Sequence, residues 1–462
     1  MLNKRKPRVL FVPVTMKLFW QLYPELEGRT RSAMASVLRQ LEARFSVEST
    51  GLVGDESEAG QLANTLSGCK TDLIVIWGNG YVASGIPLQI LDAVLDQPIV
   101  LLITQKDKVV PEDMDYAKYM ESTALTGAME LAGALMRKRR AFSSIIGQMD
   151  EQEPYEKLAR KATAAMVLRA LKEMNMGNIG YPYPGMLDIA LDEAALAELS
   201  IKTKRITLLE VENRLQSVDE AVLGSFLAEV RRTFNTVRVS EADLSRSCRL
   251  YLVLESLVVN HQLNALAVHD YECLSVVSET VSDFALSLLE NRHGLATGVE
   301  GDVPNCVSAY IARVLSGQSP MFVDWTMYDE ADNALFLQHN GKADPAIVID
   351  PVLSPSAEPF GGVVGDGVVF EAAGKPGDVT LVSMIYHKDG WHIFACEGQA
   401  LAKKAKPCRL NQITVQFANP IKSLLEKACD LGLGHHVNVA YGHFAEEIRL
   451  FADMAKIKFH SV

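Results

Sequence analysis

The chain has 462 residues, of which 48% are hydrophobic and 22% are charged, and its formal net charge is −12 at pH 7. This composition is that of an ordinary folded protein, and the length corresponds to about three domains of roughly 150 residues each. An acidic balance argues against non-specific nucleic-acid binding, which needs a basic face. No apolar run approaches the roughly 18 residues of a membrane span, so neither nucleic acid nor a membrane is an expected partner.

The N-terminus and the cysteines indicate the compartment. Basic residues precede the apolar stretch Val9–Val14, as in a signal peptide, but Pro13 interrupts this stretch and no small-residue cleavage site follows it. An opening β-strand is therefore the better interpretation. The seven cysteines form no CxxC pair and are odd in number, which is typical of reduced thiols. We expect a cytoplasmic protein.

The first third of the chain alternates strand and helix. Strands are predicted at Arg8–Val14, Asp72–Trp77 and Pro98–Ile103, and helices at Arg29–Phe45 and Ile86–Leu95. Continuous apolar strands between amphipathic helices are typical of a parallel sheet that is covered on both faces. The loops at the carboxyl ends of such strands usually carry the binding residues.

The middle of the chain repeats this alternation. Glu151–Met174 predicts a long connecting helix, and the Gly- and Pro-rich stretch Gly177–Gly185 predicts a domain boundary. The following strands are predicted at Arg205–Leu209 and Ala265–Val268, and the helices at Val218–Phe234, Glu241–Leu263, Ser278–Leu289 and Pro304–Leu315. The pattern predicts a second α/β domain.

After about residue 318 the pattern becomes rich in strands. Strands are predicted at Met321–Met327, Ala334–Gln338, Gly367–Glu371, Asp378–Tyr386 and Trp391–Glu397, and the chain ends in a helix and a strand within 440–462. The sequence HKDG at 387–390 is a hairpin-turn signal. The fold class predicted is therefore two Rossmann-like parallel-sheet α/β domains, 1–175 and 176–317, followed by a β-rich C-terminal domain, 318–462.

Four metal-capable side chains in the second half stand in specific local settings. They are Glu300 in GVEGDV, Asp324 in FVDWTMYD, His339 in LFLQHNG and His436 in GLGHHVNVAYGH. Each has an ordinary interpretation by itself: a solvated turn, a salt bridge to a core arginine, a turn residue and a core histidine. Together, two carboxylates and two imidazoles form a ligand set that suits a cation such as Mn²⁺.

The histidine pair allows two choices of ligand. Adjacent residues on a strand point to opposite faces, so we expect only one of His435 and His436 to face the site. We assign His436 as the ligand. A nucleotide site is not indicated, because Gly78-x-Gly80 lacks the rest of GxGxxG and no GxxxxGK[ST] occurs.

At this point the residues resemble a known family. GLGHHVNVAYGHFAEEIRLFADMAKIKF resembles the histidine segment of the L-arabinose isomerases. GVEGDV, followed 24 residues on by Asp324, resembles the L-fucose isomerase pattern, in which a glutamate and an aspartate at this spacing bind Mn²⁺ and transfer the proton. His339 is similar to the third ligand position of the arabinose isomerases, and PIVLLITQ at 98–105 is similar to a segment that precedes their substrate region.

Two departures accompany the resemblance, which extends in patches over nearly the whole chain. Arabinose isomerases have a glutamate at the position of Asp324, and fucose isomerases are considerably longer than this chain. The chain therefore resembles a divergent member of the L-fucose/L-arabinose isomerase superfamily. The resemblance implies two α/β domains and a β-rich domain, assembled as homo-trimers or hexamers with sites near subunit interfaces.

The resulting hypothesis is aldose–ketose isomerisation of a small sugar or sugar derivative through a cis-enediol. Mn²⁺ or another divalent cation would be held by Glu300, Asp324, His339 and His436, and Glu300 and Asp324 would share the acid–base work. Further candidates for contacts to substrate hydroxyls are Trp20, Asn79, His435 and His443, whereas Trp325 is expected to be a core aromatic.

Two alternatives remain open from the sequence. A metal-dependent sugar epimerase or aldolase could use the same site, because those reactions share enediolate chemistry. A non-catalytic sugar-binding protein could also be built from two α/β domains, although it would not need four metal-capable residues.

Overall fold

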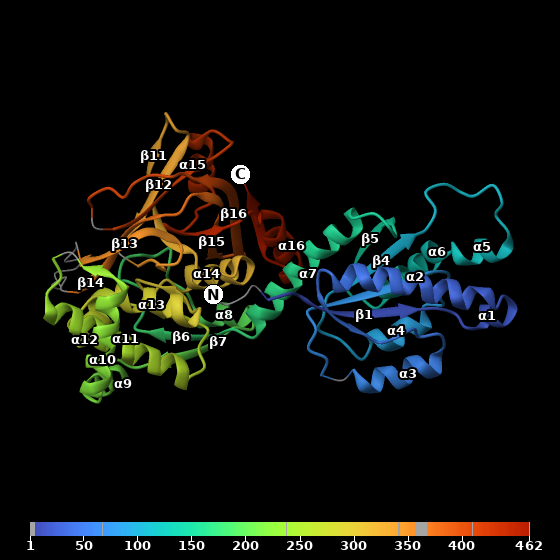
Figure 1. Ribbon diagram of the computed structural model, residues 1–462, viewed down its shortest axis with the longest axis horizontal. Coiled ribbons are helices and arrows are strands. Elements are labelled where there is room, and N and C mark those ends of the chain that lie inside the picture. Colours follow the sequence, from blue (N-terminus) through green and yellow to red (C-terminus); the bar gives the residue numbers. More distant parts are fainter. Residues whose placement is uncertain are drawn as a thin grey trace. The chain divides into compact units, whose positions relative to one another are not determined.

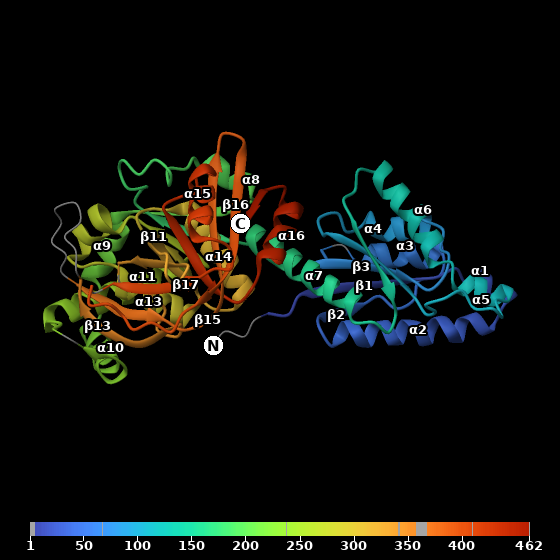
Figure 2. The same ribbon diagram turned by 90° about the horizontal axis from the view of Figure 1, so that it is seen from above.

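The computed structural model describes residues 5–66, 68–236, 238–340, 342–356, 367–408 and 410–461. The chain divides into two compact units, Arg5–Arg169 and Ala170–Val462 (Figures 1 and 2). Both units contain a parallel sheet, and the second also contains a β-rich barrel. The predicted mixed architecture, with parallel sheets first and a β-rich part last, is confirmed at this level.

The N-terminal unit is built on one parallel sheet in the order β2-β1-β3-β4-β5. Its strands are β1 (Arg8–Val14), β2 (Ser46–Ser49), β3 (Leu73–Gly78), β4 (Ile99–Gln105) and β5 (Ser143–Gln148). Its helices are α1 (Leu18–Leu22), α2 (Glu25–Glu42), α3 (Glu56–Thr65), α4 (Gly85–Leu91), α5 (Tyr116–Glu121) and α6 (Ala124–Arg137), and α7 (Glu153–Lys172) follows. The three predicted strands form because their continuous apolar runs are buried at the centre of the sheet.

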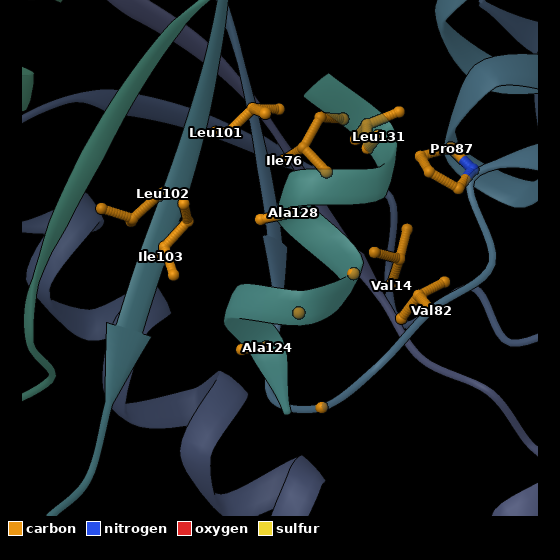
Figure 3. Close-up of a pocket in the computed structure, with 13 residues that line it drawn as sticks. Val14, Ile76, Val82, Pro87, Leu101, Leu102, Ile103, Ala124, Ala128 and Leu131 are labelled. Atoms are coloured by element: carbon orange, nitrogen blue, oxygen red, sulfur yellow. The ribbon is translucent and has the colours of Figure 1, made fainter. Parts of the chain in front are cut away.

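A small cavity of about 30 Å³ lies where α6 packs on the ends of β1, β3 and β4. Figure 3 shows its labelled lining side chains, which are all apolar. The volume is that of a single water molecule, and an apolar lining offers such a water no hydrogen-bond partners. We interpret this cavity as a packing gap rather than as a functional site.

The second unit begins with a parallel sheet in the order β10-β9-β6-β7. Its strands are β6 (Asn175–Ile179), β7 (Lys202–Ile206), β9 (Ala265–Val268) and β10 (Ala296–Gly298). The stretch Gly177–Gly185, predicted as a boundary, thus begins inside a strand that pairs on both sides. Gly177 serves close packing there, because a Cβ would lie 2.6 Å from the Leu263 side chain.

Helices cover this sheet and connect it to the barrel. They are α8 (Glu193–Glu198), α9 (Leu208–Gln216), α10 (Glu220–Thr233), α11 (Glu241–Asn260), the π-helical turn η1 (Asp270–Leu274), α12 (Ser275–Ser278), α13 (Asp283–His293) and α14 (Val303–Ser316). Two predictions differ from these elements. The predicted strand Arg205–Leu209 ends at Ile206, because the Thr207 side chain caps α9. The predicted helix Ser278–Leu289 begins only at Asp283, since Glu279 is left-handed at φ +52°.

The β-rich part forms a closed antiparallel barrel, because β16 also pairs with β17 and thereby closes a run of six strands within a ten-stranded sheet. The barrel strands are, in order around the barrel, β16 (Gly390–Ala400), β15 (Gly377–His387), β18 (His436–Tyr441), β11 (Met321–Asp329), β12 (Ala334–His339) and β17 (Asn411–Gln416). The predicted HKDG hairpin is confirmed, since His387 pairs with Gly390.

Further elements extend the barrel. The strands β14 (Val368–Gly374), β13 (Val348–Pro355), β8 (Asn235–Thr236) and β19 (Lys458–Ser461) extend the sheet, and α15 (Ile421–Asp430) and α16 (Ala445–Ala455) complete the elements. Helix α14 packs against both the parallel sheet, at β9 and β10, and the barrel, at β15 and β18. This helix therefore fixes the barrel relative to the loop that carries Glu300.

Two further observations concern the chain as a whole. Among the described ranges, none of the helices combines the length and the hydropathy that crossing a bilayer requires. All seven cysteines lie in the described ranges and are free thiols, as the sequence predicts.

Candidate metal centre

The structure brings the four predicted ligands together from four separate elements. Glu300 follows β10, Asp324 lies in β11, His339 ends β12 and His436 begins β18. One oxygen of Glu300 lies 3.6 Å from His339 Nε2, and the other lies 3.4 Å from His436 Nε2. Asp324 Oδ1 lies 3.5 Å from the same His436 Nε2. Asp324 and His436 are direct partners in the register of β11 and β18, so strand pairing sets their distance.

Glu300 stands on a strained turn. Its φ is +57° and that of Gly301 is +71°, and a left-handed conformation at a non-glycine residue costs about 1–3 kcal/mol. The Glu300 N–H donates to Asp270 Oδ1 at 2.9 Å, and its carbonyl accepts from Tyr183 N at 2.9 Å. A Cβ at position 301 would lie 2.3 Å from the Tyr181 carbonyl oxygen. The close contact and the positive φ together favour glycine at position 301.

His436 is oriented by the carboxylate of Asp302, which is not among the predicted site residues. Asp302 Oδ2 lies 2.8 Å from His436 Nδ1, while Asp302 Oδ1 accepts from Asn305 N at the start of α14. An aspartate just before a helix that carries a proline in its first turn is a helix-capping signal. That signal could have placed Asp302 at a helix start, but no local pattern indicates its contact with His436.

His435 also reaches the site, which corrects the expectation that only one histidine of the pair would face it. His435 Nε2 lies 3.5 Å from Glu300 Oε2, and the centroids of the two adjacent imidazole rings are 3.9 Å apart. Strand alternation does not apply because β18 begins at His436, so His435 belongs to the preceding loop. Its Nδ1 lies 2.6 Å from Asp188 Oδ2.

The charges of the site are strongly coupled. Burial alone would raise the pKa of Glu300, but the three imidazoles of His339, His435 and His436 outweigh burial and hold this pKa well below its usual range. Burial likewise opposes protonation of His339, yet the charges of Asp324 and Glu300 raise the pKa of His339 to about 9. Glu300 is therefore ionised at neutral pH, and protons on the imidazoles balance the carboxylates in the absence of a cation.

The loop carboxylate Asp188 is coupled to its histidine in the same way. Its hydrogen bond to His435 lowers the pKa of Asp188 to about 2. Burial opposes protonation of His435, but hydrogen bonds to Asp188 and Glu300 raise the pKa of His435 to about 10. At neutral pH this contact therefore joins a carboxylate to a protonated imidazole.

The arrangement of donor atoms fits a divalent cation. One ligand atom each from Glu300, His339 and His436 lie within 4.8 Å of one another, and so do atoms of Asp324, His435 and His436. The Nε2 of His436 is buried and makes no hydrogen bond to any described residue. A buried nitrogen that faces two carboxylates without a hydrogen bond is suited to a cation, and mixed oxygen and nitrogen donors suit Mn²⁺.

The remaining predicted residues have other surroundings. The side chain of Asp324 is 34% exposed and faces His436 rather than a core arginine. Trp325 packs against the barrel core and donates to the Gly434 carbonyl, as a structural aromatic does. His443 lies beyond the opposite end of β18 from His436, where it contacts Gly398 and Glu397, so the structure does not bring it to the cluster.

Two predicted substrate residues, Trp20 and Asn79, belong to the N-terminal unit. The guanidinium of Arg31 lies 5.6 Å from the ring centroid of Trp20. Asn79 is buried, and its Nδ2 lies 3.5 Å from Glu121 Oε1. Their contact with a sugar stays a prediction.

Comparison with known proteins supports an isomerase. No protein-family model matches the chain. It is 22% identical over 460 residues to the sulfoquinovose isomerases of Priestia aryabhattai and Priestia megaterium, which covers 95% of this chain and 96% of each relative. The sulfoquinovose isomerase of Alkalicoccus urumqiensis is 22% identical over 337 residues, 71% of this chain and 74% of the relative. The similarity thus extends along the chain rather than over one motif, and it supports the prediction of an aldose–ketose isomerase.

Proposed function

We propose that this protein is a metal-dependent aldose–ketose isomerase and that its substrate is a sulfonated aldose of the sulfoquinovose type. The observation that carries the reaction class is the cluster that Glu300, Asp324, His339 and His436 form, in which both carboxylates lie within 3.5 Å of His436 Nε2 and Glu300 also lies 3.6 Å from His339 Nε2. The names of the full-length relatives carry the choice of sugar. The resemblance to the L-fucose/L-arabinose isomerase superfamily supports the same reaction.

The chemistry follows from the residues at the site. Glu300, Asp324, His339 and His436 would hold a divalent cation, which we propose is Mn²⁺. When bound, this cation would act as a Lewis acid that stabilises negative charge on the enediolate oxygens, an effect worth several kcal/mol. Isomerisation moves one proton from C2 to C1 and another from the C2 hydroxyl to the C1 oxygen. Either Glu300 or Asp324 takes the carbon-bound proton and returns it to the neighbouring carbon.

The site favours a carboxylate base. A general base must be deprotonated at the working pH and within reach of the proton. The lowered pKa of Glu300 meets the first condition. Asp324 borders the solvent-accessible side of the cluster, since its side chain is 34% exposed and that of Glu300 is 8% exposed. Asp324 is therefore the more accessible of the two carboxylates to a sugar that enters from solvent.

Product analysis tests the reaction. The purified protein is stripped of metal with a chelator, reloaded with Mn²⁺, and incubated in D₂O with sulfoquinovose, glucose, L-fucose and L-arabinose. We expect NMR to show that sulfoquinovose is converted to a ketose with deuterium at C1, and that the aldose formed by the reverse reaction carries deuterium at C2, only in the presence of the cation. An epimer would indicate an epimerase, shorter carbon chains an aldolase, and metal-independent binding without turnover a sugar-binding protein.

A Glu300→Ala variant tests the site. We expect it to abolish turnover and weaken Mn²⁺ binding. Glu279→Ala is the matched control, because Glu279 has a similar left-handed backbone at φ +52° but is exposed and outside the cluster. Wild-type activity in Glu300→Ala would overturn the assignment.

The proposal also includes two features expected from the sequence pattern, Rossmann-like parallel-sheet domains and a cytoplasmic location. Assembly as a homo-trimer or hexamer is added because the family resemblance implies it. Light scattering of the purified protein would measure the number of subunits directly.

A further inference from the structure

The loop between β6 and α8, residues 180–192, is anchored on the turn that carries Glu300. Tyr183 N donates to the Glu300 carbonyl at 2.9 Å, and the Tyr181 carbonyl lies against Gly301 so closely that a Cβ there would be 2.3 Å from its oxygen. The path of this loop is therefore tied to Glu300. Asp188 lies in the same loop, which places its carboxylate beside the barrel strand β18.

Asp188 holds His435 by two hydrogen bonds to one oxygen. Asp188 Oδ2 accepts from the backbone N–H of His435 at 3.0 Å and lies 2.6 Å from the ring Nδ1. A carboxylate that contacts both the backbone and the ring of one residue restricts the rotation of that side chain. It also keeps a proton on Nδ1, which leaves Nε2 as the nitrogen that faces the site.

The Asp188–His435 pair lies next to the Asp302–His436 pair and differs from it in exposure. The side chain of His436 is 1% exposed, and its Nε2 faces both Glu300 and Asp324. The side chain of His435 is 38% exposed, and its Nε2 lies 3.5 Å from Glu300 Oε2. Of these two adjacent rings, the buried one is placed for a cation, and the open one is placed for a ligand that enters from solvent.

We propose that Asp188 is a positioning residue that fixes the His435 ring with Nε2 directed at a hydroxyl oxygen of the sugar, next to Glu300. This inference rests on the proposed isomerase function. A sugar hydroxyl can donate to the Nε2 of a neutral imidazole or accept from that of a protonated one, so the ring serves in either state once its orientation is set. Asp188 itself does not touch the substrate.

A double-mutant cycle tests the positioning role. Asp188→Ala, His435→Ala and the double variant are compared for kcat and KM in the Mn²⁺-loaded enzyme. We expect Asp188→Ala to lower kcat/KM about 10–100-fold, the usual effect of removing a group that orients a site histidine. His435→Ala should lower kcat/KM at least as much, because the ring itself is lost. The double variant should be no worse than His435→Ala, because a positioning residue has nothing left to position.

Two further variants separate positioning from general structure. Asp188→Asn keeps an oxygen acceptor, so we expect it to recover part of the activity that Asp188→Ala loses. Asp192→Ala is the matched control, because Asp192 lies in the same loop but caps α8 through Ala194 N; its kcat and KM should stay within about twofold of wild type. Mn²⁺ content should stay at the wild-type level in all of these variants.

Two results of the double-mutant cycle would overturn the positioning role of Asp188. Losses that multiply in the double variant would show that Asp188 and His435 act independently, and loss of Mn²⁺ from Asp188→Ala would show a role in the metal site instead. A second readout needs no turnover: in protein labelled with ¹⁵N-histidine, Asp188→Ala should shift the Nδ1 resonance of His435. If the wild type turns over no sugar, the isomerase proposal fails, while an unshifted resonance would reject the Asp188 contact by itself.

Discussion

The carboxylate of Asp302 connects a helix to a ring: Asp302 Oδ2 lies 2.8 Å from His436 Nδ1, while Oδ1 caps α14. Because α14 begins just after the Glu300 turn, one side chain fixes both the end of that turn and the orientation of the facing imidazole. A carboxylate on the far nitrogen of a metal-binding histidine sets its tautomer and raises its basicity. The same side chain therefore links the start of α14 to the candidate metal centre.

Asp302→Asn should separate these two roles. Asparagine caps a helix about as well as aspartate does, but with its oxygen on the cap it presents an amide N–H₂ to His436 Nδ1. The ring would then have to carry its proton on Nε2, which faces Glu300 and Asp324. We expect the affinity for Mn²⁺ to fall about 10–100-fold, measured by electron paramagnetic resonance of free Mn²⁺, with little change in thermal stability.

The exposed cap Asp219 provides the control for this substitution. Its side chain accepts from Ala221 N and Val222 N at the start of α10. Asp219→Ala therefore removes a helix cap and nothing else, which lowers the free energy of unfolding by about 1 kcal/mol. Mn²⁺ affinity should be unchanged in Asp219→Ala. Wild-type affinity in Asp302→Asn would show that the aspartate acts only as a cap.

Gly301→Ala should damage both stability and activity. A Cβ at this position would meet the Tyr181 carbonyl oxygen at 2.3 Å, and φ is +71°. Gly51 is the matched control, because its φ is +72° and a Cβ there would have no other heavy atom within 4 Å. Gly51→Ala should cost the left-handed strain alone, about 1–2 kcal/mol. Urea unfolding should show that Gly301→Ala lowers the free energy of unfolding more than Gly51→Ala does. An equal decrease in the two variants would indicate that the backbone around Tyr181 moves to make room for the added Cβ.

Mn²⁺ binding should release protons. In the metal-free protein the pKa of His339 is about 9, so its ring is protonated at pH 7.5 and must lose a proton to become a ligand. The apparent affinity should therefore rise with pH, by about tenfold per unit for each proton released, and level off near pH 9. Calorimetry in buffers of different ionisation enthalpy counts these protons. An affinity that is constant between pH 6.5 and 8.5 would contradict the assignment of His339.

The stability of the metal-free protein should fall as pH rises, whereas its affinity for Mn²⁺ should increase. The pKa of His339 in the fold, about 9, lies above the roughly 6.5 of an unfolded histidine. Its contribution to stability is thus fully present below about pH 6.5 and is lost as pH rises through about 9. We expect the Tm of the metal-free protein to fall across this interval, and a smaller fall in His339→Gln would identify the group.

His443→Ala tests the one predicted histidine that lies away from the cluster. Its ring contacts Gly398 and Glu397, so we expect kcat and KM to stay within about twofold of wild type. His435→Ala is the paired comparison, since its ring faces Glu300. A large loss in His443→Ala would show that His443 reaches a sugar by a contact outside this cluster.

Local patterns determined most of the elements and the four metal-capable residues. The strands β1, β3 and β4 were predicted because a buried parallel strand is a continuous apolar run in the sequence itself. The hairpin at His387–Gly390 was predicted because its turn residues are adjacent. Glu300 and His436 were selected from glycine-rich and histidine-pair motifs that lie within a few residues of them.

Ambiguous patterns account for two placements that local sequence left open. Glycine allows a turn and also allows close packing, so Gly177 could mark a boundary or the middle of β6 until Leu263 was placed beside it. Alternation along a strand applies only inside the strand, so the placement of His435 depended on where β18 begins. Neither question can be settled without knowing which distant residues are neighbours.

The sequence by itself determined which side chains could bind a cation, and only the tertiary structure decided which carboxylates orient them. Asp188 and His435 are 247 residues apart along the chain, and Asp302 and His436 are 134 apart. A hydrogen bond over such a separation leaves no periodicity in the sequence, because its geometry arises from the packing of α14 and the β6–α8 loop against the barrel. The type of each ligand is thus set by the local sequence, whereas the orientation of its side chain is set by the fold.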